Sequence, residues 1–231
     1  MSKPISIAID GPVGAGKSCI ADQVAARLGM LHLDTGAMYR AVGYYMTRQG
    51  VPLSDHALVT RRLPEVRVDV AFQEGAQHVY VNGEDVTAHL RDNEVSMAAS
   101  AVSAVPAVRE YLVAEQRRIA ADQGVVMDGR DIGTQVLPDA PLKIYLTADP
   151  EERARRRLKQ MKEDKGIELP FEQVLSELMA RDDADMHREV SPLRKAEDAV
   201  EVDSTHMTQE ETVATIMALV ESRGGGNHGK R

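Results

Sequence analysis

The chain has little cysteine and few aromatic residues. Among its 231 residues are one cysteine, Cys19, two phenylalanines and no tryptophan, and aromatic residues make up only 3%. A single cysteine excludes an intrachain disulfide and a cysteine-based metal cluster. The core must therefore be aliphatic, and an exposed aromatic surface that stacks single-stranded bases is not expected.

The chain also lacks an excess of positive charge and any long apolar run. Its net charge of −8 argues against binding to nucleic acid polymers, which draws on an excess of lysine and arginine. No stretch approaches the roughly 20 apolar residues that a membrane span needs. The N-terminus carries one lysine and no small-residue cleavage site, so we expect no signal peptide and a cytoplasmic location.

Short apolar segments alternate with helical patterns along most of the chain. A helix is predicted at Lys17–Leu28, ending at Gly29, and another between Gly36 and Gly50. The predicted core strands are residues 5–10, 31–34, 125–128, 143–147 and 199–203. This alternation predicts an α/β protein with a five-stranded parallel sheet flanked by helices.

Two segments depart from that alternation. Val66–Phe72 and His78–Val81 alternate with a period of two, and Asn82-Gly83 is a strong hairpin signal, so we expect a small antiparallel insert. Residues 153–188 are charge-rich and helical, with an interruption near 166–170, which suggests a helical lid.

The segment from Gly11 to Ser18 fits the pattern G-x-x-x-x-G-K-[ST] of a P-loop. Its glycines allow backbone N–H groups to converge on phosphate oxygens, while Lys17 reaches the β- and γ-phosphates and the Ser18 hydroxyl meets Mg²⁺. A glycine-rich turn that binds nothing is the alternative, and the strand before and the helix after this segment argue against it. The predicted ATP-binding residues are Gly11, Pro12, Val13, Gly14, Ala15, Gly16, Lys17, Ser18 and Cys19.

A P-loop alone does not distinguish a kinase from a GTPase or an ATPase. The chain has no Asn-Lys-x-Asp run of the kind that reads guanine. Where many translocating ATPases carry an Asp-Glu pair, it reads Asp128-Gly-Arg-Asp131.

Further motifs resemble the bacterial cytidylate kinases, in that family's order and over residues 5–205. They are the P-loop, Leu33-Asp-Thr-Gly-Ala-Met-Tyr-Arg40, Asp128-Gly-Arg-Asp-Ile-Gly-Thr134, Arg181-Asp182 through Arg188, Ser191-Pro192-Leu193 and Asp198-Ala199. The resemblance implies a nucleoside monophosphate kinase fold. It also implies Mg²⁺-dependent transfer of a phosphoryl group from ATP to CMP or dCMP.

The resemblance also implies roles for individual residues. Arg40 and Arg130 would hold the α-phosphate of CMP, Arg181 and Asp185 would contact its sugar, and Thr35 would help to hold the nucleotide. The cytosine-reading residues would be Ser100, Arg109 and Asp131. The catalytic residues would be Lys17, Arg130, Arg153, Arg157 and Arg188.

The chemistry of these residues also supports binding of cytosine and phosphate. An aspartate such as Asp131 accepts a hydrogen bond from the cytosine amino group but would face a carbonyl oxygen in uracil. Arginine suits phosphate because its planar fork makes bidentate contacts and stays charged. Ser18 and Asp128 are the expected Mg²⁺ residues, with Asp128 acting through water. No general base is expected, because a phosphate acceptor is already ionised near neutral pH.

Several of the charged residues and the cysteine also have a purely structural interpretation. Arg155 and Arg156 are expected to be a solvated helix face, paired with acids four residues earlier. Arg181, Asp185 and Arg188 lie on one helix face and could form ordinary surface ion pairs. Cys19 is expected to be a packed helix residue rather than a reactive thiol.

Two positions depart from the family pattern. Cys19 stands where threonine is usual, which removes a hydroxyl next to the nucleotide phosphates. Ala184 stands where the family typically has a second arginine, which removes one positive charge from the lid.

The sequence thus predicts one kinase domain at 1–222, with a core at 1–62, 96–156 and 189–222. An inserted CMP-binding subdomain is expected at about 63–95, a lid at about 157–188 and a disordered tail at 223–231. We expect a monomer. A kinase for another small acceptor, such as UMP, AMP or shikimate, and a nucleotide-binding regulator without catalysis remain as alternatives.

Overall fold

The structure is a computed structural model that describes residues 5–224. The described chain forms two compact units. One contains residues 31–125, and the other, here called the P-loop unit, contains residues 5–30 and 126–224. Among the described residues, no helix has both the length and the apolar character needed to cross a membrane.

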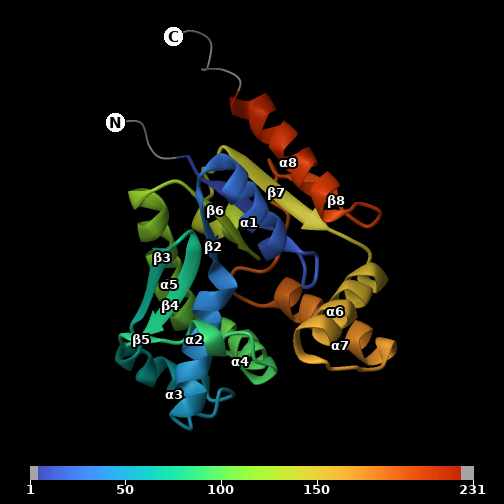
Figure 1. The fold of residues 1–231 in the computed structure, drawn as a ribbon. Coiled ribbons are helices and arrows are strands. Elements are labelled where there is room, and N and C mark those ends of the chain that lie inside the picture. Colours follow the sequence, from blue (N-terminus) through green and yellow to red (C-terminus); the bar gives the residue numbers. More distant parts are fainter. Residues whose placement is uncertain (1–4, 225–231) are drawn as a thin grey trace. The chain divides into compact units, whose positions relative to one another are not determined.

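The P-loop unit contains the strands and helices that come before and after residues 31–125 in the sequence (Figure 1). In chain order they are β1 (Ile7–Asp10), α1 (Lys17–Leu28), β6 (Val125–Gly129), the π-helix η3 (Ile132–Val136), β7 (Leu142–Thr147), α6 (Pro150–Lys165), α7 (Phe171–His187), β8 (Val200–Asp203) and α8 (Gln209–Gly224).

With β2 (Leu31–Asp34), the parallel sheet has the strand order β2-β6-β1-β7-β8, which confirms the predicted five-stranded sheet. β1 pairs in parallel with β6 and β7, and β7 pairs in parallel with β8. Every residue of β1 is buried, as its mostly apolar sequence predicts for a strand covered on both faces. Ile7 and Ile9 of this strand share one aliphatic cluster with Ile20 and Val24 of α1 and with Val213 and Ile216 of α8. This cluster fixes the helix that follows the P-loop against the sheet.

The P-loop begins where β1 ends, close to the backbone of β7. A Cβ atom built on Gly11 would lie 2.0 Å from the Leu146 carbonyl oxygen, and Gly11 has a φ of +154°. Only glycine fits this close approach of two backbones. The strand-to-loop junction is therefore fixed by backbone contact rather than by a side chain.

The 31–125 unit contains the remaining elements. They are β2 (Leu31–Asp34), α2 (Thr35–Arg48), α3 (His56–Arg62), η1 (Leu63–Glu65), β3 (Val68–Gln73), β4 (Ala76–Val81), β5 (Glu84–Asp85), η2 (Thr87–His89), α4 (Asn93–Ser103) and α5 (Pro106–Asp122). Within this unit α2 packs against α4 and also touches β4.

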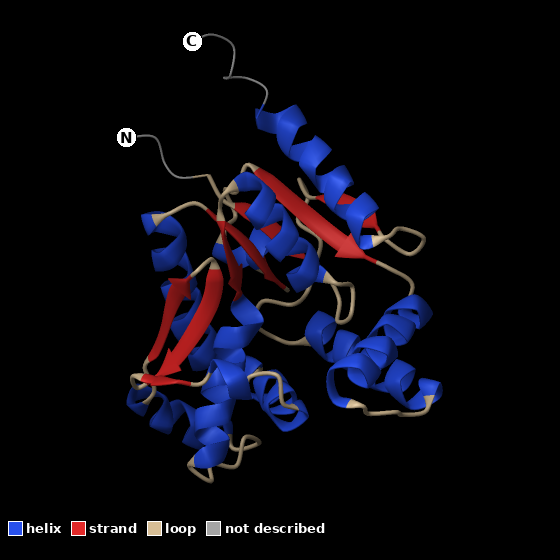
Figure 2. Ribbon diagram, in the orientation of Figure 1, coloured by secondary structure: helices blue, strands red, loops and turns tan. Residues whose placement is uncertain are grey.

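The predicted antiparallel insert is confirmed as the three-stranded sheet β3-β4-β5 (Figure 2). Its turns differ in one respect from the sequence prediction. Glu74-Gly75, with φ values of 51° and 82°, joins the two long strands. Asn82-Gly83 instead turns β4 into the short strand β5. Both turns place two successive residues at positive φ, as the right-handed twist of a tight hairpin requires.

The segment predicted as a helical lid, at about 157–188, contains the second half of α6 and the whole of α7. Gly166 ends α6 in the left-handed conformation, and α7 begins after Pro170, as the interruption near 166–170 predicts. At the C-terminus, α8 continues through Gly224, two residues into the predicted disordered tail. The rest of that predicted tail, residues 225–231, lies outside the described residues.

Candidate active site

Lys17 lies inside the P-loop. Gly16 precedes α1 with a φ of 85°, and Lys17 is the first residue of the helix. The Lys17 ammonium donates a 2.7 Å hydrogen bond to the Pro12 carbonyl of the same loop. Burial, and then the charge of Arg130, lowers the pKa of Lys17 to about 7. Bound phosphate oxygens would favour the charged form, so this group is suited to an anionic ligand.

Ser18 and Asp128 form the second part of the phosphate cradle. The Ser18 hydroxyl donates a 2.8 Å hydrogen bond to a carboxylate oxygen of Asp128, which is buried at the end of β6. The described residues contain no cluster of three or more histidine, cysteine or acidic side chains that could hold a metal alone. One hydroxyl and one carboxylate fit Mg²⁺, which takes oxygen ligands, keeps several waters and draws the rest of its shell from substrate phosphates.

Cys19 is exposed, so the expectation that it packs as a helix residue is wrong. Its thiol lies 3.4 Å from the Gln209 amide oxygen, and the Gln23 amide donates to its sulfur at the same distance. The side chain therefore bridges α1 and the start of α8 at the surface.

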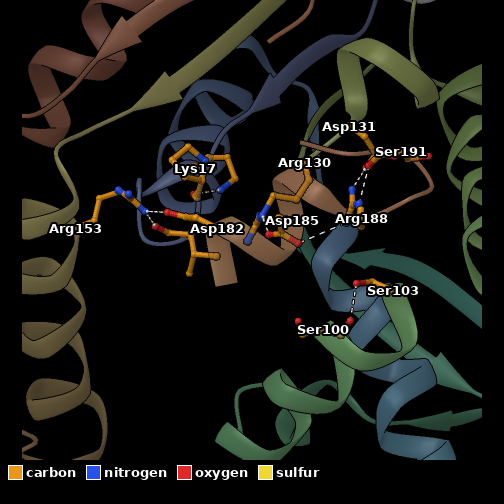
Figure 3. A network of polar contacts seen from close by, with 12 residues as sticks. Lys17, Ser100, Ser103, Arg130, Asp131, Arg153, Asp182, Asp185, Arg188 and Ser191 are labelled. Carbon is orange, nitrogen blue, oxygen red and sulfur yellow. Dashed lines mark hydrogen bonds and ion pairs between the residues drawn. The ribbon is translucent and has the colours of Figure 1, made fainter. Parts of the chain in front are cut away.

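Arginines and aspartates form a network at the end of β6, on α7 and just after it (Figure 3). Arg188 follows the last residue of α7 in an extended conformation, so the expectation that it shares a helix face with Arg181 and Asp185 is wrong. Arg130 Nε donates to Asp185 Oδ2 over 2.9 Å, and Arg188 lies 3.5 Å from the other carboxylate oxygen of Asp185. Arg188 also lies 3.6 Å from Asp131 and donates a 2.6 Å bond to the Ser191 carbonyl. The structure thus joins Arg130, Asp131, Asp185 and Arg188, which come from two distant segments of the sequence.

The charges in this network keep Asp185 ionised. Burial acts to raise the pKa of Asp185, but Arg130 and Arg188 hold it below its usual value. Arg181, half-buried on the same helix, adds to this effect. An ionised Asp185 fixes two arginines at neutral pH and leaves them charged, as contact with a phosphate requires.

Asp10, to which no sequence motif points, holds the loop that carries Arg130 and Asp131. Its two carboxylate oxygens accept 2.7 Å hydrogen bonds from the backbone N–H groups of Ile132 and Gly133. Asp10 is 4% exposed, and burial raises its pKa to about 6 although both hydrogen bonds oppose the rise. The last residue of β1 therefore orders the loop after β6.

This raised pKa predicts a pH-dependent contribution to stability. The folded protein binds the Asp10 proton more tightly than the unfolded chain, so the contribution is full below the ordinary aspartate pKa of 3.8 and is lost as pH rises through about 6. We expect the free energy of unfolding of the wild type, relative to Asp10→Asn, to fall by about 3 kcal/mol across that window. Urea unfolding at half-unit pH steps measures this difference. Replacement of the exposed Asp139 by Asn is the control, and equal slopes for wild type and Asp10→Asn would contradict the predicted linkage.

The remaining arginines of α6 have separate environments. Arg155 and Arg156 pair with Glu151 and Glu152 four residues earlier, as predicted. The expected solvated face is wrong for Arg156, which is half-buried and donates a 2.6 Å bond to the Ser204 carbonyl. Arg157 is half-buried and donates a 3.1 Å bond to Gln160. Arg153 is buried, and its contacts lie with the P-loop and α7.

In the 31–125 unit, two predicted residues lie at the start of α2. Thr35 is its first residue and is 3% exposed. Asp34 caps the helix by accepting from Ala37 N–H, and its other oxygen accepts from Arg40 over 2.6 Å. The Gln77 side chain of β4 bonds to both the N–H and the carbonyl of Asp34. The antiparallel sheet therefore fixes the residue that orients Arg40.

Two other predicted residues of this unit meet around Ser103. The Ser103 hydroxyl donates a 2.8 Å bond to the Ser100 carbonyl, and the Ser103 carbonyl accepts from Arg109 over 3.4 Å. Arg109 is only 2% exposed, and its guanidinium lies 5.3 Å from the centre of the Tyr39 ring. A buried arginine held over an aromatic face keeps its charge in a fixed place.

The predicted site residues are divided between the two units. Thr35, Arg40, Ser100 and Arg109 belong to the 31–125 unit. The P-loop residues, Asp128, Arg130, Asp131, Arg153, Arg157, Arg181, Asp185 and Arg188 belong to the P-loop unit. Four residues that hold these side chains or their loops in place were not predicted from the sequence: Asp10, Asp34, Gln77 and Asp182.

Comparison with known proteins matches nearly the whole chain to one family. Residues 7–222 match the family model described as cytidylate kinase. A cytidylate kinase of Caldicellulosiruptor bescii is 48% identical over 94% of this chain and 96% of its own length. One from Bacillus velezensis is 46% identical over 96% of this chain and 99% of its own length.

A comparison of structures supports the fold alone. The crystal structure of an uncharacterized protein from Eubacterium ventriosum superimposes with a TM-score of 0.51 at 14% identity. The match covers 95% of this chain and 99% of that one.

Proposed function

Because the chain belongs to the cytidylate kinase family, we propose that it transfers the γ-phosphoryl group of ATP to CMP and dCMP with the help of Mg²⁺. The products are ADP together with CDP or dCDP. The kinase activity on CMP follows from the family, whereas the donor, the metal and the deoxynucleotide acceptor belong to the proposal.

The observation that carries the proposal is the phosphate cradle at the start of α1. Lys17 lies inside the loop, and the Ser18–Asp128 pair lies at the end of β6. A buried ammonium beside an oxygen-ligand pair is the arrangement that a nucleoside triphosphate and its Mg²⁺ require. When bound, the Mg²⁺ would neutralise charge on the transferring phosphoryl group, held by Ser18 directly and by Asp128 through water.

The protein supplies position and charge for the transfer rather than covalent chemistry. Lys17 would hold the β- and γ-phosphates of ATP, and Arg130 the α-phosphate of CMP. Arg157 and Arg188 would neutralise the phosphoryl group in flight. Asp185 orients Arg130 and Arg188 in the structure, so both cations are fixed before a ligand arrives.

The proposed contacts to CMP follow the family positions. Thr35 and Arg40 would hold the phosphate end, and Arg181 and Asp185 the sugar. Cytosine would be read by Ser100, Arg109 and Asp131. The enclosed positions of Arg109 and Asp131, at 2% and 4% exposure, support this role because water competes little with a buried hydrogen bond.

A hollow on the P-loop unit supports a nucleotide donor. It measures about 550 Å³ and lies between the start of α6, the helix α7 and the loop after β8. This is within the range of roughly 300–1,000 Å³ for small-molecule sites. Leu175 and Met179 offer apolar surface, and the arginine on the lining, Arg155, is already paired with Glu151 and Glu152, so the hollow suits the ring of a base rather than phosphate. We propose that it takes the adenine end of ATP.

Product analysis tests the proposed reaction. ATP, Mg²⁺ and CMP incubated with the protein should give ADP and CDP in equal amounts, and dCMP should give dCDP. Chelation of the metal with EDTA should stop both reactions. Release of inorganic phosphate in place of CDP would overturn the proposal, and full activity in EDTA would remove Mg²⁺ from it.

We further infer that the protein acts as a monomer in the cytoplasm on these small nucleotides and does not bind nucleic acid polymers. Its net charge of −8 supports the last point.

A further inference from the structure

We propose that Asp182 and Arg153 are positioning residues that hold the P-loop in its phosphate-binding conformation, through the backbone of Val13. This inference rests on the proposed use of ATP. It gives Arg153 an indirect role, in place of the direct phosphate contact that the family resemblance implies.

Both polar backbone groups of Val13 are bound by this ion pair. The Val13 N–H donates to Asp182 Oδ1 over 2.9 Å, and the Val13 carbonyl accepts from Arg153 Nη1 over 2.7 Å. The pair closes on itself, because the same Arg153 nitrogen donates to Asp182 Oδ2 over 2.5 Å. Figure 3 shows the guanidinium of Arg153 facing the carboxylate of Asp182.

Arg153 has a third hydrogen-bond partner in this arrangement. Its Nε donates a 2.9 Å bond to the Ala148 carbonyl just before α6. The side chains of Arg153 and Asp182 are 6% and 9% exposed. Moving the guanidinium to a phosphate would break bonds to three residues and leave Asp182 buried without its cation, which is costly.

Apolar packing fixes the same part of the loop. The Val13 side chain belongs to one cluster with Ala154 of α6 and Val174 and Leu178 of α7. At Gly14, an added Cβ would lie 3.3 Å from the Arg153 Cβ and 3.6 Å from a Leu178 methyl group. The loop therefore rests on both α6 and α7, and the ion pair sets the direction of its peptide groups.

The consequence falls on the donor nucleotide. The backbone N–H groups that follow Val13 can point at phosphate only while the Val13 peptide group is held in place. Weakening the ion pair should therefore raise the free-energy cost of ordering the loop when ATP or ADP binds. CMP contacts other residues, so its binding should change little. A split between the two Michaelis constants therefore distinguishes positioning from a general loss of stability.

The variants are Asp182→Asn and Arg153→Lys. Asparagine keeps an oxygen for the Val13 N–H but loses the charge, and lysine keeps the charge but cannot reach Val13, Asp182 and Ala148 together. Asp183→Asn is the matched control, since Asp183 is the next residue of α7 and is exposed. The baseline is CDP formation from CMP and ATP by the wild type. If the wild type forms no CDP, the proposed function fails, whereas this inference is tested by ADP binding.

We expect both variants to raise the KM for ATP and the dissociation constant for ADP about tenfold, the cost of one charge-assisted contact. The KM for CMP should stay within about twofold, and the double variant should bind ADP no more weakly than the worse single variant. Unchanged ADP binding in a folded variant would overturn the proposal. Loss of turnover in Arg153→Lys with normal behaviour of Asp182→Asn would also overturn it and assign Arg153 to the phosphates. If one variant does not fold, the other decides alone on the same readouts.

Discussion

Replacing Lys17 with methionine should lower the turnover number for CDP formation roughly 10²–10³-fold, the effect of removing one positioned electrostatic donor. The ammonium is bonded inside the P-loop at 2.7 Å from the Pro12 carbonyl, where the proposed β- and γ-phosphates would take its place. Methionine matches the length of the side chain without its charge. The measurement is steady-state CDP formation at saturating ATP and CMP.

The same variant should not lose stability at pH 8. Burial lowers the pKa of Lys17 from 10.5 to about 7, so the folded state disfavours the charge that the unfolded chain carries between those values. Removing the amine removes that penalty, and the urea midpoint of Lys17→Met should equal or exceed that of the wild type. Lys159→Met, at an exposed site on α6, is the control for both measurements. Near-normal turnover in Lys17→Met would refute the assignment.

Replacing Asp131 with asparagine should reduce the preference for CMP over UMP, measured as the ratio of the two kcat/KM values, by roughly 10- to 100-fold. A misplaced acceptor facing a buried carboxylate costs about 1–3 kcal/mol. Asparagine offers an amide donor to the carbonyl of uracil and so removes that penalty. Asp131 is 4% exposed, which keeps water from taking the place of the missing partner.

The ratio of the two kcat/KM values separates the recognition of the base by Asp131 from its ion pair with Arg188. Asp131 also lies 3.6 Å from Arg188, and loss of that ion pair should slow CMP and UMP alike. Asp139→Asn, an exposed substitution shortly after the same loop, should change neither rate. A retained CMP preference in Asp131→Asn would mean that another residue reads the base, and it would favour a kinase for a different acceptor.

The core of the fold could be predicted because its signals are local. The residues Gly11 to Ser18 fix a loop between a buried strand and a helix, and α1 begins and ends at the predicted residues. The five apolar segments became the five strands because short buried runs flanked by helical patterns have few alternatives in an α/β protein. Turn signals were less specific. Both Glu74-Gly75 and Asn82-Gly83 form tight turns, and only strand pairing shows which one joins the longer strands.

The residues that hold the site could not be found in the same way. Asp10 meets Ile132 and Gly133 from more than 120 positions away, and Asp182 meets Val13 from 169 positions away. These contacts are made to backbone groups, which leave no signature in the sequence, although Asp182 also pairs with the Arg153 side chain. Asp10 offered one signal, since a charged residue ending a fully buried strand needs a compensating partner.

Cys19 shows the limit of arguing from residue type. Cysteine is commonly buried, and its helix is half-covered, so packing was the natural expectation. The third position of α1 nevertheless faces outward, toward Gln209. A one-residue step along a helix turns a side chain by about 100°, which is enough to exchange core for surface.

The central claim is that this chain phosphorylates CMP by reading cytosine. Its most direct test is ADP release from ATP and Mg²⁺ in parallel reactions with CMP, dCMP, UMP, AMP, GMP, shikimate and water. We expect strong release with CMP and dCMP, weak release with UMP and negligible release with water. Strong release with another acceptor and not with CMP, or release with none of them, would contradict the claim.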